Sequence, residues 1–257
     1  MKTNRFREVI ASGRMPVGHM VLEFATRGIA RILESVDLDF VVFDMEHSGF
    51  DVDRIYDLVA WAKATPLTPF VRVPQNEYHF LARVMDSGAM GVMVPNVETA
   101  EAAQAIVNAV KYPPDGKRGV ALGTTHTDFL TPPDPAEYYR EINASSVVIC
   151  QIESSIGVAN AESIAAVPGV DCLWIGHMDL STSLGIPGRF DDGLFTQAMA
   201  TVVSAARKHG KLLGIQPGTA QQADAWIAAG FNVISWGSDV GVYRSALASG
   251  VAALRSR

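Results

Sequence analysis

Ionisable side chains stand within or just after several separate apolar runs of this 257-residue chain. His47, Arg72, Glu153 and Asp179 each belong to a different run. If these runs are parallel strands of one sheet, their carboxyl ends meet at one edge and bring the four side chains together. Two carboxylates on neighbouring strands can share one hard divalent cation. The fork of an arginine fits a carboxylate or keto oxygen, and an imidazole beside an acid suits a general base.

The acidic groups also have a purely structural interpretation. Glu153 and Asp179 could be capping or ion-paired carboxylates, an outcome as common as metal ligation for any single acid. Their shared position at strand ends favours a metal site. His177 is open between two roles, a third metal ligand or a residue that shapes the loop before Asp179.

His47 and Arg72 also have structural interpretations. Asp44 or Glu46 could orient the His47 imidazole and raise its basicity, whereas a lone loop histidine is more often structural. Arg72 lies among Val71, Val73 and Pro74, where an unpaired charge is costly. An internal salt bridge to Glu46 or Asp44 would satisfy it, and such a bridge is compatible with binding a substrate oxygen.

Lysine, serine and cysteine give little support to other mechanisms. No lysine lies at the carboxyl end of an expected strand; Lys211 precedes one, at the opposite rim. A Schiff-base mechanism is therefore disfavoured, and enolate chemistry would depend on a metal as electron sink. No G-x-S-x-G elbow is present. Cys150 and Cys172 lie in apolar runs, which predicts buried thiols rather than a disulfide.

The elements expected to position these residues alternate regularly along the chain. Short, continuously apolar runs are typical of strands covered by helices on both sides. A (β/α)8 TIM barrel, a single α/β domain over residues 1–257, fits this order. A doubly wound sheet is the rival, but no G-x-G-x-x-G follows the first strand. The expected strands are 17–22, 40–43, 70–73, 91–94, 146–151, 172–175, 212–215 and 232–235, and the expected helices are 27–35, 51–64, 80–87, 99–110, 158–167, 194–209, 220–229 and 240–255.

Composition excludes several classes of protein. With 48% hydrophobic and 19% charged residues, the chain has enough apolar material for a large core. A formal net charge of -6 and the lack of a basic stripe argue against nucleic-acid binding. The sequence shows neither a signal peptide nor a membrane-length apolar stretch. A cytoplasmic protein acting on small molecules is expected.

Six motifs in order resemble the metal-dependent class II pyruvate aldolases. This family includes 4-hydroxy-2-oxoheptanedioate aldolase, 2-dehydro-3-deoxyglucarate aldolase and macrophomate synthase, with citrate lyase β-subunits as more distant relatives. The resemblance covers nearly the whole chain. The motifs occupy residues 43–47 (FDMEH), 71–74 (VRVP), 94–102 (VPNVETAEA), 112–119 (YPPDGKRG), 151–154 (QIES) and 175–181 (IGHMDLS).

The resemblance implies a role for each of the principal site residues. It implies that Glu153 and Asp179 hold a divalent metal, usually Mg²⁺, with Mn²⁺ or Co²⁺ as substitutes. Pyruvate or a close 2-oxo acid would bind that metal, and Arg72 would stabilise the enolate. His47, oriented by Asp44, would act as acid and base together with a water held by the metal.

The resemblance also extends to the substrate-binding turn and to assembly. Gln151 would hydrogen-bond within the site, and the backbone amides of Met178 and Asp179, in the turn that begins at Gly176, would hold the substrate carboxylate. Asp86 matches a family position that reaches a neighbouring subunit's site. A homo-oligomer, a trimer or hexamer with an exchanged C-terminal helix, is implied. The chain departs from the family pattern at His177, where many relatives have proline, and at Met45, where glycine is common.

The reaction expected from this resemblance is reversible cleavage of a 4-hydroxy-2-oxo acid into pyruvate, or a close 2-oxo acid, and an aldehyde. Oxaloacetate decarboxylation passes through the same enolate and is the first alternative, together with lyase chemistry on an acyl-CoA ester. A non-catalytic barrel that binds 2-oxo acids is the remaining alternative, and His47 beside two acids argues against it. The sequence does not define the aldehyde partner.

Overall fold

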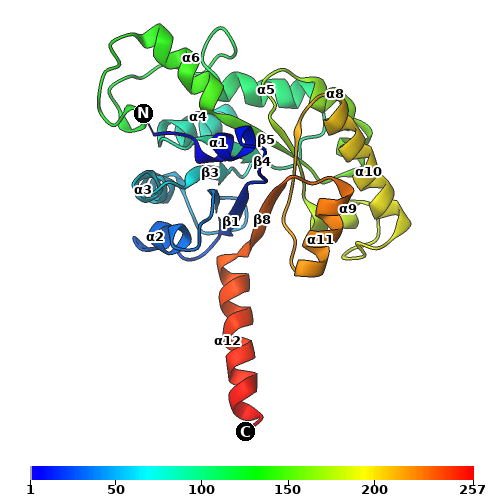
Figure 1. The fold of residues 1–257 in the computed structure, drawn as a ribbon. Coiled ribbons are helices and arrows are strands. Elements are labelled where there is room, and N and C mark those ends of the chain that lie inside the picture. The colour runs from blue at the N-terminus through cyan, green and yellow to red at the C-terminus, as the bar shows by residue number, and fades with distance from the viewer. Residues whose placement is uncertain (1) are drawn as a thin grey trace.

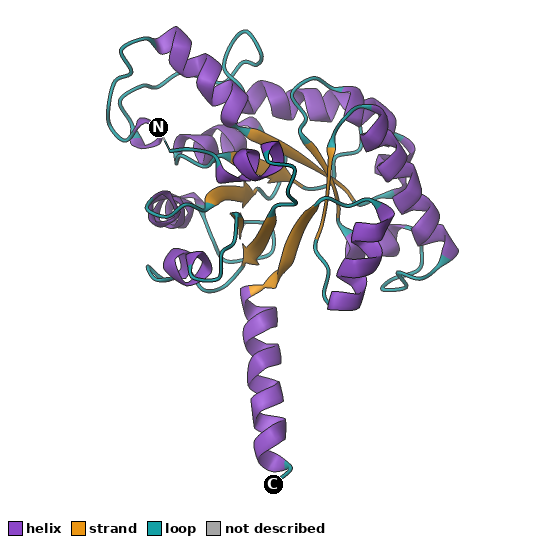
Figure 2. Ribbon diagram, viewed as in Figure 1, coloured by secondary structure: helices purple, strands orange, loops and turns teal. Residues whose placement is uncertain are grey.

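Eight parallel strands close into a barrel in which each strand pairs with its neighbours in chain order. The computed structural model describes residues 2–257. The barrel predicted from the sequence is thus confirmed, and Figure 2 shows its strands at the centre with helices around them. The strands are β1 (Val17–Val21), β2 (Phe40–Asp44), β3 (Thr68–Arg72), β4 (Gly91–Val94), β5 (Val147–Ile152), β6 (Cys172–Ile175), β7 (Leu212–Ile215) and β8 (Val233–Ser238).

The helices that follow the strands form the outer layer (Figure 1). Most of the expected helices are present within one or two residues of their predicted bounds. The single helix predicted over 158–167 is wrong, because the chain breaks at Asn160 into two short helices. The helices are α1 (Arg5–Ala11), α2 (Ile29–Glu34), α3 (Val52–Lys63), α4 (Tyr78–Asp86), α5 (Ala100–Val110), α6 (Pro135–Ser145), α7 (Ser155–Ala159), α8 (Ala161–Ala166), α9 (His177–Ser183), α10 (Gly193–Lys208), α11 (Ala220–Ala229) and α12 (Asp239–Arg255), with a 3-10 turn, η1, at Thr125–Thr127.

Two apolar layers hold the barrel together. Alternate strand residues point outward and pack beneath the helices, while the others fill the interior. In β2, for example, Val41 and Phe43 belong to the outer layer, and Phe40 and Val42 belong to the inner one. The same alternation brings Asp44 to the inner face at the carboxyl end of the strand.

Helix α1, which the sequence pattern did not predict, closes the amino end of the barrel. Phe6 is fully buried and meets Phe40 and Phe70 edge to face, with ring centroids 5.5 and 5.0 Å apart. The backbone N–H of Phe6 donates to Thr68 Oγ1 at 3.0 Å. A barrel sealed at this end leaves the opposite mouth, at the carboxyl ends of the strands, for chemistry.

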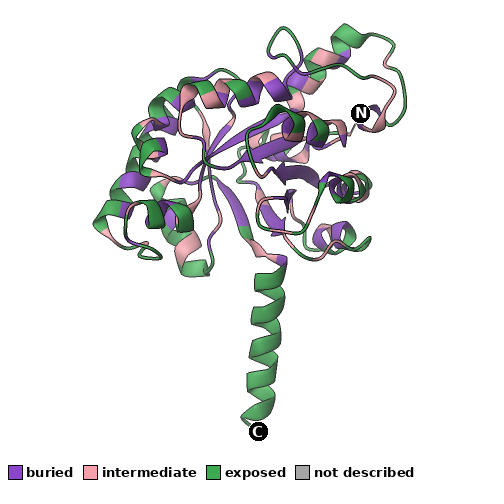
Figure 3. Ribbon diagram, turned by 180° about the vertical axis from the view of Figure 1, so that it is seen from behind, coloured by how far each residue is buried: buried purple, intermediate pink, exposed green. Residues whose placement is uncertain are grey.

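Helix α12 leaves the barrel and projects away from it (Figures 1 and 3). Asp239 at its first turn is its sole buried residue. Within residues 2–257, no helix combines the length and the hydropathy needed to cross a bilayer.

Candidate active site at the barrel mouth

The centre of the mouth is a buried ion pair between two adjacent strands. The register of β2 and β3 places Asp44 opposite Arg72. Arg72 donates from Nε to Asp44 Oδ1 and from Nη2 to Asp44 Oδ2, each at 2.7 Å. Asp44 is fully buried and Arg72 is 8% exposed. This two-pronged contact fixes the guanidinium plane, as the salt bridge anticipated from the sequence requires.

Glu46 and His47 continue from Asp44 around the same rim. The third guanidinium nitrogen, Arg72 Nη1, lies 3.0 Å from Glu46 Oε2. The His47 ring is largely exposed, with Nε2 3.9 Å from Glu46 Oε2. The Asp44 carboxylate instead accepts the backbone N–H of His47 at 3.3 Å. Within residues 2–257, therefore, Asp44 holds the loop of His47 and makes no hydrogen bond to its imidazole.

Glu153 lies at the end of β5, 4% exposed. Its Oε1 accepts the backbone N–H of Asn96 at 2.6 Å, and its Oε2 accepts Nε2 of Gln151 at 3.2 Å. Asn96 adopts a left-handed backbone conformation (φ 52°), which asparagine tolerates better than most residues. Gly176 passes so close that a Cβ there would lie 2.1 Å from Glu153 Oε2. A glycine is therefore required at the turn above the carboxylate.

Burial raises the pKa values of two carboxyl groups at the mouth. Burial raises the pKa of Glu153 to about 7; the Asn96 N–H opposes this, and the charges of Glu46 and Asp179 add to it. Burial likewise raises the pKa of Glu46, against the opposing charge of Arg72. Carboxyl groups held in this state are typical of sites that bind a cation or transfer protons.

Two buried acceptors at the mouth lack hydrogen-bond partners among residues 2–257. One is Gln151 Oε1, on a side chain that is 2% exposed, and the other is Glu46 Oε2, which has only the ion pair described above. A buried polar atom without a partner is costly unless a ligand, ion or water completes it. Both atoms carry lone pairs and suit a cation or a donor from a substrate.

The turn after β6 brings the other predicted carboxylate to the mouth. Asp179 lies in the first turn of α9, and its charge contributes to the raised pKa of Glu153. Met178 is half exposed in the same turn. The His177 ring packs against Phe190 and Trp226, at centroid distances of 5.1 and 5.4 Å. This aromatic packing matches the loop-shaping role of His177 rather than metal ligation.

Asp86 is separated from the other site residues of its own chain. It ends α4, a helix that runs back from the mouth, and it accepts Arg118 Nη2 at 2.5 Å. The Arg118 side chain is 1% exposed and stacks on Tyr112, 4.6 Å from the ring centre. One chain therefore gathers Asp44, His47, Arg72, Gln151, Glu153 and Asp179 at the mouth, and leaves Asp86 at the far rim.

A metal at this mouth would depend on few protein ligands. Among the described residues, no three His, Cys, Asp or Glu side chains gather closely enough to hold a metal by themselves. The carboxylates of Glu153 and Asp179 and the unpartnered Gln151 oxygen are hard donors, which suit Mg²⁺ or Mn²⁺. Such a site would need oxygen atoms from water or substrate to complete it.

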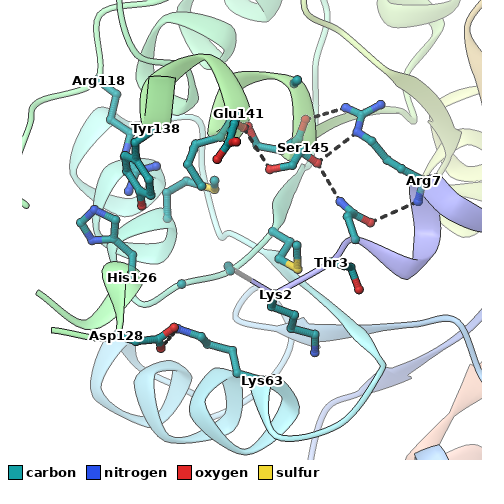
Figure 4. A pocket seen from close by; sticks show the side chains of 18 of the residues that line it. Lys2, Thr3, Arg7, Lys63, Arg118, His126, Asp128, Tyr138, Glu141 and Ser145 are labelled. Carbon is teal, nitrogen blue, oxygen red and sulfur yellow. Dashed lines mark hydrogen bonds and ion pairs between the residues drawn. The ribbon is translucent and has the colours of Figure 1, made fainter. Parts of the chain in front are cut away.

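A cavity of about 480 Å³ lies at the amino-terminal rim, between the first residues of the chain, α3, α4 and α6 (Figure 4). Its cationic side chains are already paired. Lys63 contacts Asp128, and Arg7 donates to the carbonyl oxygens of Ser145 and Ser146 at 3.0 and 2.6 Å. These internal partners give Lys63 and Arg7 a structural role at this cavity.

Glu46 was expected from the sequence as an alternative partner of both His47 and Arg72, and the structure places it beside both. One contribution to the mouth was not assigned from the sequence: Asn96 acts through its backbone N–H, which no residue type reveals. The positive φ at Asn96 is the local feature that turns this N–H toward Glu153.

Several known proteins resemble this chain in sequence and fold. The chain is 34% identical to a 5-keto-4-deoxy-D-glucarate aldolase of Klebsiella pneumoniae, over 95% of this chain and 93% of that protein. It is similar to the solved HpcH/HpaI aldolase from Desulfitobacterium hafniense, with a TM-score of 0.93 and 32% identity over 98% and 96% of the two chains. It also matches macrophomate synthase, with a TM-score of 0.82 and 26% identity over 98% and 88%. The model of one family, HpcH/HpaI aldolase/citrate lyase, matches residues 20–246, so the chain belongs to that family.

Proposed function

We propose that this carbon–carbon lyase is an aldolase that reversibly cleaves a 4-hydroxy-2-oxo acid to pyruvate, or a close 2-oxo acid, and an aldehyde. The observation that carries the proposal is that Arg72, Glu153 and Gln151 lie at one mouth, where Gln151 Oε1 has no hydrogen-bond partner among residues 2–257. Removing a proton from the C4 hydroxyl breaks the C3–C4 bond, releases the aldehyde and leaves an enolate. Protonation at C3 then gives pyruvate.

Arg72 is proposed to stabilise the enolate oxygen. Its guanidinium is held by Asp44 before substrate arrives, so little reorganisation is needed as charge develops. His47 is proposed to take up the C4 hydroxyl proton, since its ring is exposed at the rim and lies near Glu46. The amides of Met178 and Asp179, in the turn after Gly176, would hold the substrate carboxylate.

Glu153 and Asp179 would hold a divalent cation, Mg²⁺ or, as substitutes, Mn²⁺ or Co²⁺. These carboxylates and Gln151 Oε1, which has no hydrogen-bond partner among residues 2–257, fit such an ion. When bound, it supplies a Lewis acid that polarises the oxygens of the 2-oxo acid. Gln151 hydrogen-bonds Glu153 and would fix the orientation of that carboxylate.

Assembly into a homo-oligomer, a trimer or hexamer, is part of the proposal. Along α12, an exposed apolar stripe runs at helical spacing through Val240, Tyr243, Leu247, Val251 and Leu254. An apolar stripe on a projecting helix is typical of a surface covered by another subunit, and a second copy exchanging the helix would cover it. Asp86 would then serve the neighbouring subunit's site.

The direct test is a pyruvate-formation screen over 4-hydroxy-2-oxo acids that differ at C4. We expect pyruvate from at least one member, loss of activity with a chelator, and recovery with Mg²⁺ or Mn²⁺. Oxaloacetate is included, because its decarboxylation shares the enolate and would accompany the aldol activity. Turnover of oxaloacetate alone would favour a decarboxylase, and full activity in the presence of chelator would contradict the metal requirement.

A further inference from the structure

Asp239, the first residue of α12, has an unusual set of partners for an acidic side chain. It is 5% exposed. Its Oδ1 accepts the backbone N–H groups of Leu22 at 3.1 Å and Val240 at 2.8 Å. Its Oδ2 accepts those of Glu23 at 2.9 Å and Phe24 at 2.7 Å. One carboxylate therefore ties three successive amides after β1 to the start of α12.

No ion pair in the described part of the chain includes Asp239. Its charge is compensated by peptide N–H groups, which converge on it as they do on anions bound by backbone nests. Hydrogen bonds to a charged acceptor are among the stronger ones in proteins. The contact is therefore a firm link between two segments that lie more than two hundred residues apart in sequence.

The amides that Asp239 holds belong to the wall of the mouth. Strand β1 pairs with β2 so that Val21 lies opposite Phe43, which places Leu22 level with Asp44. The Leu22 side chain packs against the interior apolar cluster of the barrel. Leu22 thus stands on the inner face, in the layer of the carboxylate that fixes Arg72.

A second contact links the same loop to the same helix. The Phe24 ring meets Tyr243 of α12 edge to face, with centroids 5.6 Å apart. Beneath it, His19 Nδ1 lies 2.7 Å from the carbonyl oxygen of Trp236, at the junction of β1 and β8. The position of this part of the wall is therefore set by the start of α12, the helix proposed above to pack on a second subunit.

We propose that Asp239 is a positioning residue: it holds the loop Leu22–Phe24 on the start of α12 and so sets the inner wall of the mouth against which the 2-oxo acid binds. This inference rests on the proposed function for its consequence on substrate binding. The hydrogen-bonded link itself is independent of that function. A second subunit that packs on α12 would then influence the position of the mouth wall through Asp239.

The test compares the full-length wild type with Asp239→Asn, an isosteric change that replaces one acceptor by a donor facing N–H groups. Amide hydrogen exchange of residues 22–24 should accelerate about ten- to hundredfold, with the amides of β5 unchanged. The KM for the best 4-hydroxy-2-oxo acid should rise about tenfold while kcat changes by less than about threefold. Asp224→Asn, an exposed acid on α11, is the matched control and should leave both readouts unchanged.

Phe24→Leu provides a second variant, which keeps the carboxylate link and an apolar side chain against the outer apolar layer but removes the ring contact with Tyr243. It should shift both readouts in the same direction by less than Asp239→Asn. Unchanged exchange at residues 22–24 in Asp239→Asn would show that the link does not hold the loop. Faster exchange with an unchanged KM, or an equal loss in kcat, would overturn the positioning role. Absence of wild-type turnover would contradict the proposed function instead, and the exchange data would still judge the link.

Discussion

Buried charged groups at the two rims of the barrel differ in how fully other groups of the protein compensate their charge. At the amino-terminal rim, Lys111 is 4% exposed and its Nζ donates to Asn143 O at 2.5 Å, Ser146 O at 2.7 Å and Ser146 Oγ at 3.2 Å. Lys2 is held in the same manner by the carbonyls of Ala62, Thr65 and Leu67. At the mouth, Glu153 has one backbone and one side-chain donor, and its neighbours Glu46 and Asp179 carry the same sign of charge.

This difference indicates that the buried charge of Lys111 stabilises the fold, whereas the charges at the mouth are available to bind a ligand. Burial lowers the pKa of Lys111 to about 8, but each of its protons has an acceptor and nothing more is needed. At the mouth, Gln151 Oε1 has no partner among residues 2–257, and Glu46 Oε2 has only its ion pair with Arg72. A site kept incomplete at a stability cost is expected where a ligand completes it.

The largest predicted effect follows from removing the charge of Glu153 at the mouth. Glu153→Gln should weaken Mg²⁺ binding and lower aldol cleavage at least about 10³-fold, because the loss of a metal ligand removes several kcal/mol of transition-state stabilisation. Calorimetric Mg²⁺ titration and steady-state kinetics measure this. Glu162→Gln, an exposed acid paired with Lys208, should behave as wild type. Wild-type metal affinity in Glu153→Gln would contradict the assignment.

The next effect concerns the fork of Arg72. Arg72→Lys keeps the positive charge but cannot span both oxygens of Asp44, so kcat should fall about 10²–10³-fold. Arg31→Lys, on an exposed pair with Glu34, is the control for the same chemical change. Near-UV circular dichroism verifies the fold of each variant. Turnover close to wild type in Arg72→Lys would remove the enolate-stabilising role.

Asp86 offers a test of whether the far rim completes a neighbouring mouth. Asp86→Asn and Glu153→Gln should each be impaired alone, whereas oligomers reassembled from an equal mixture should regain about a quarter of wild-type sites, those with both residues intact. The measurement is the specific activity after joint refolding. Activity no higher than the average of the two parents would place Asp86 outside the neighbour's site.

The smallest effect is the pH dependence of stability at the amino-terminal rim. The folded-state pKa of Lys111, about 8, lies below its ordinary value of 10.5. Between these values the unfolded chain binds more protons, so wild-type stability relative to Lys111→Met should rise with pH, by at most about 1.4 kcal/mol per pH unit. Urea unfolding at pH 7, 8 and 9 measures this difference. A difference that falls with pH would contradict the assignment. Above pH 9 the buried Cys150 thiol, with a raised pKa, acts in the opposite direction in both proteins.

The sequence predicted the barrel because its strands are continuously buried and short, and each is followed by a helical period. The same strand pattern predicted that four side chains lie at one rim, because the carboxyl ends of parallel strands meet there: Asp44, Arg72, Glu153 and Asp179. Helices α1, α6 and α9 were not predicted. Helices α1 and α9 have only seven residues each, and the 11-residue α6 buries only Tyr138 and Asn143, too little to show an apolar period. The predicted free, buried state of Cys150 and Cys172 is confirmed.

What the sequence could not give depends on side-chain directions and backbone amides. Torsion angles decide whether the Asp44 carboxylate accepts a hydrogen bond from the His47 ring or from the His47 backbone N–H. In the structure it accepts the backbone N–H. Asp239 follows β8 at the mouth like the other acids, yet its carboxylate is filled by N–H groups from β1 and α12. Residue type and position alone do not distinguish it from Glu153.

The most direct measurement of the central claim is deuterium exchange of the pyruvate methyl protons in D2O, followed by NMR without any aldehyde. The account predicts that the wild type with Mg²⁺ exchanges these protons, and that chelator or Arg72→Ala suppresses the exchange by at least about 10²-fold, because enolate formation needs both the cation and the guanidinium. Exchange at the wild-type rate in Arg72→Ala, or undiminished by chelator, would contradict it.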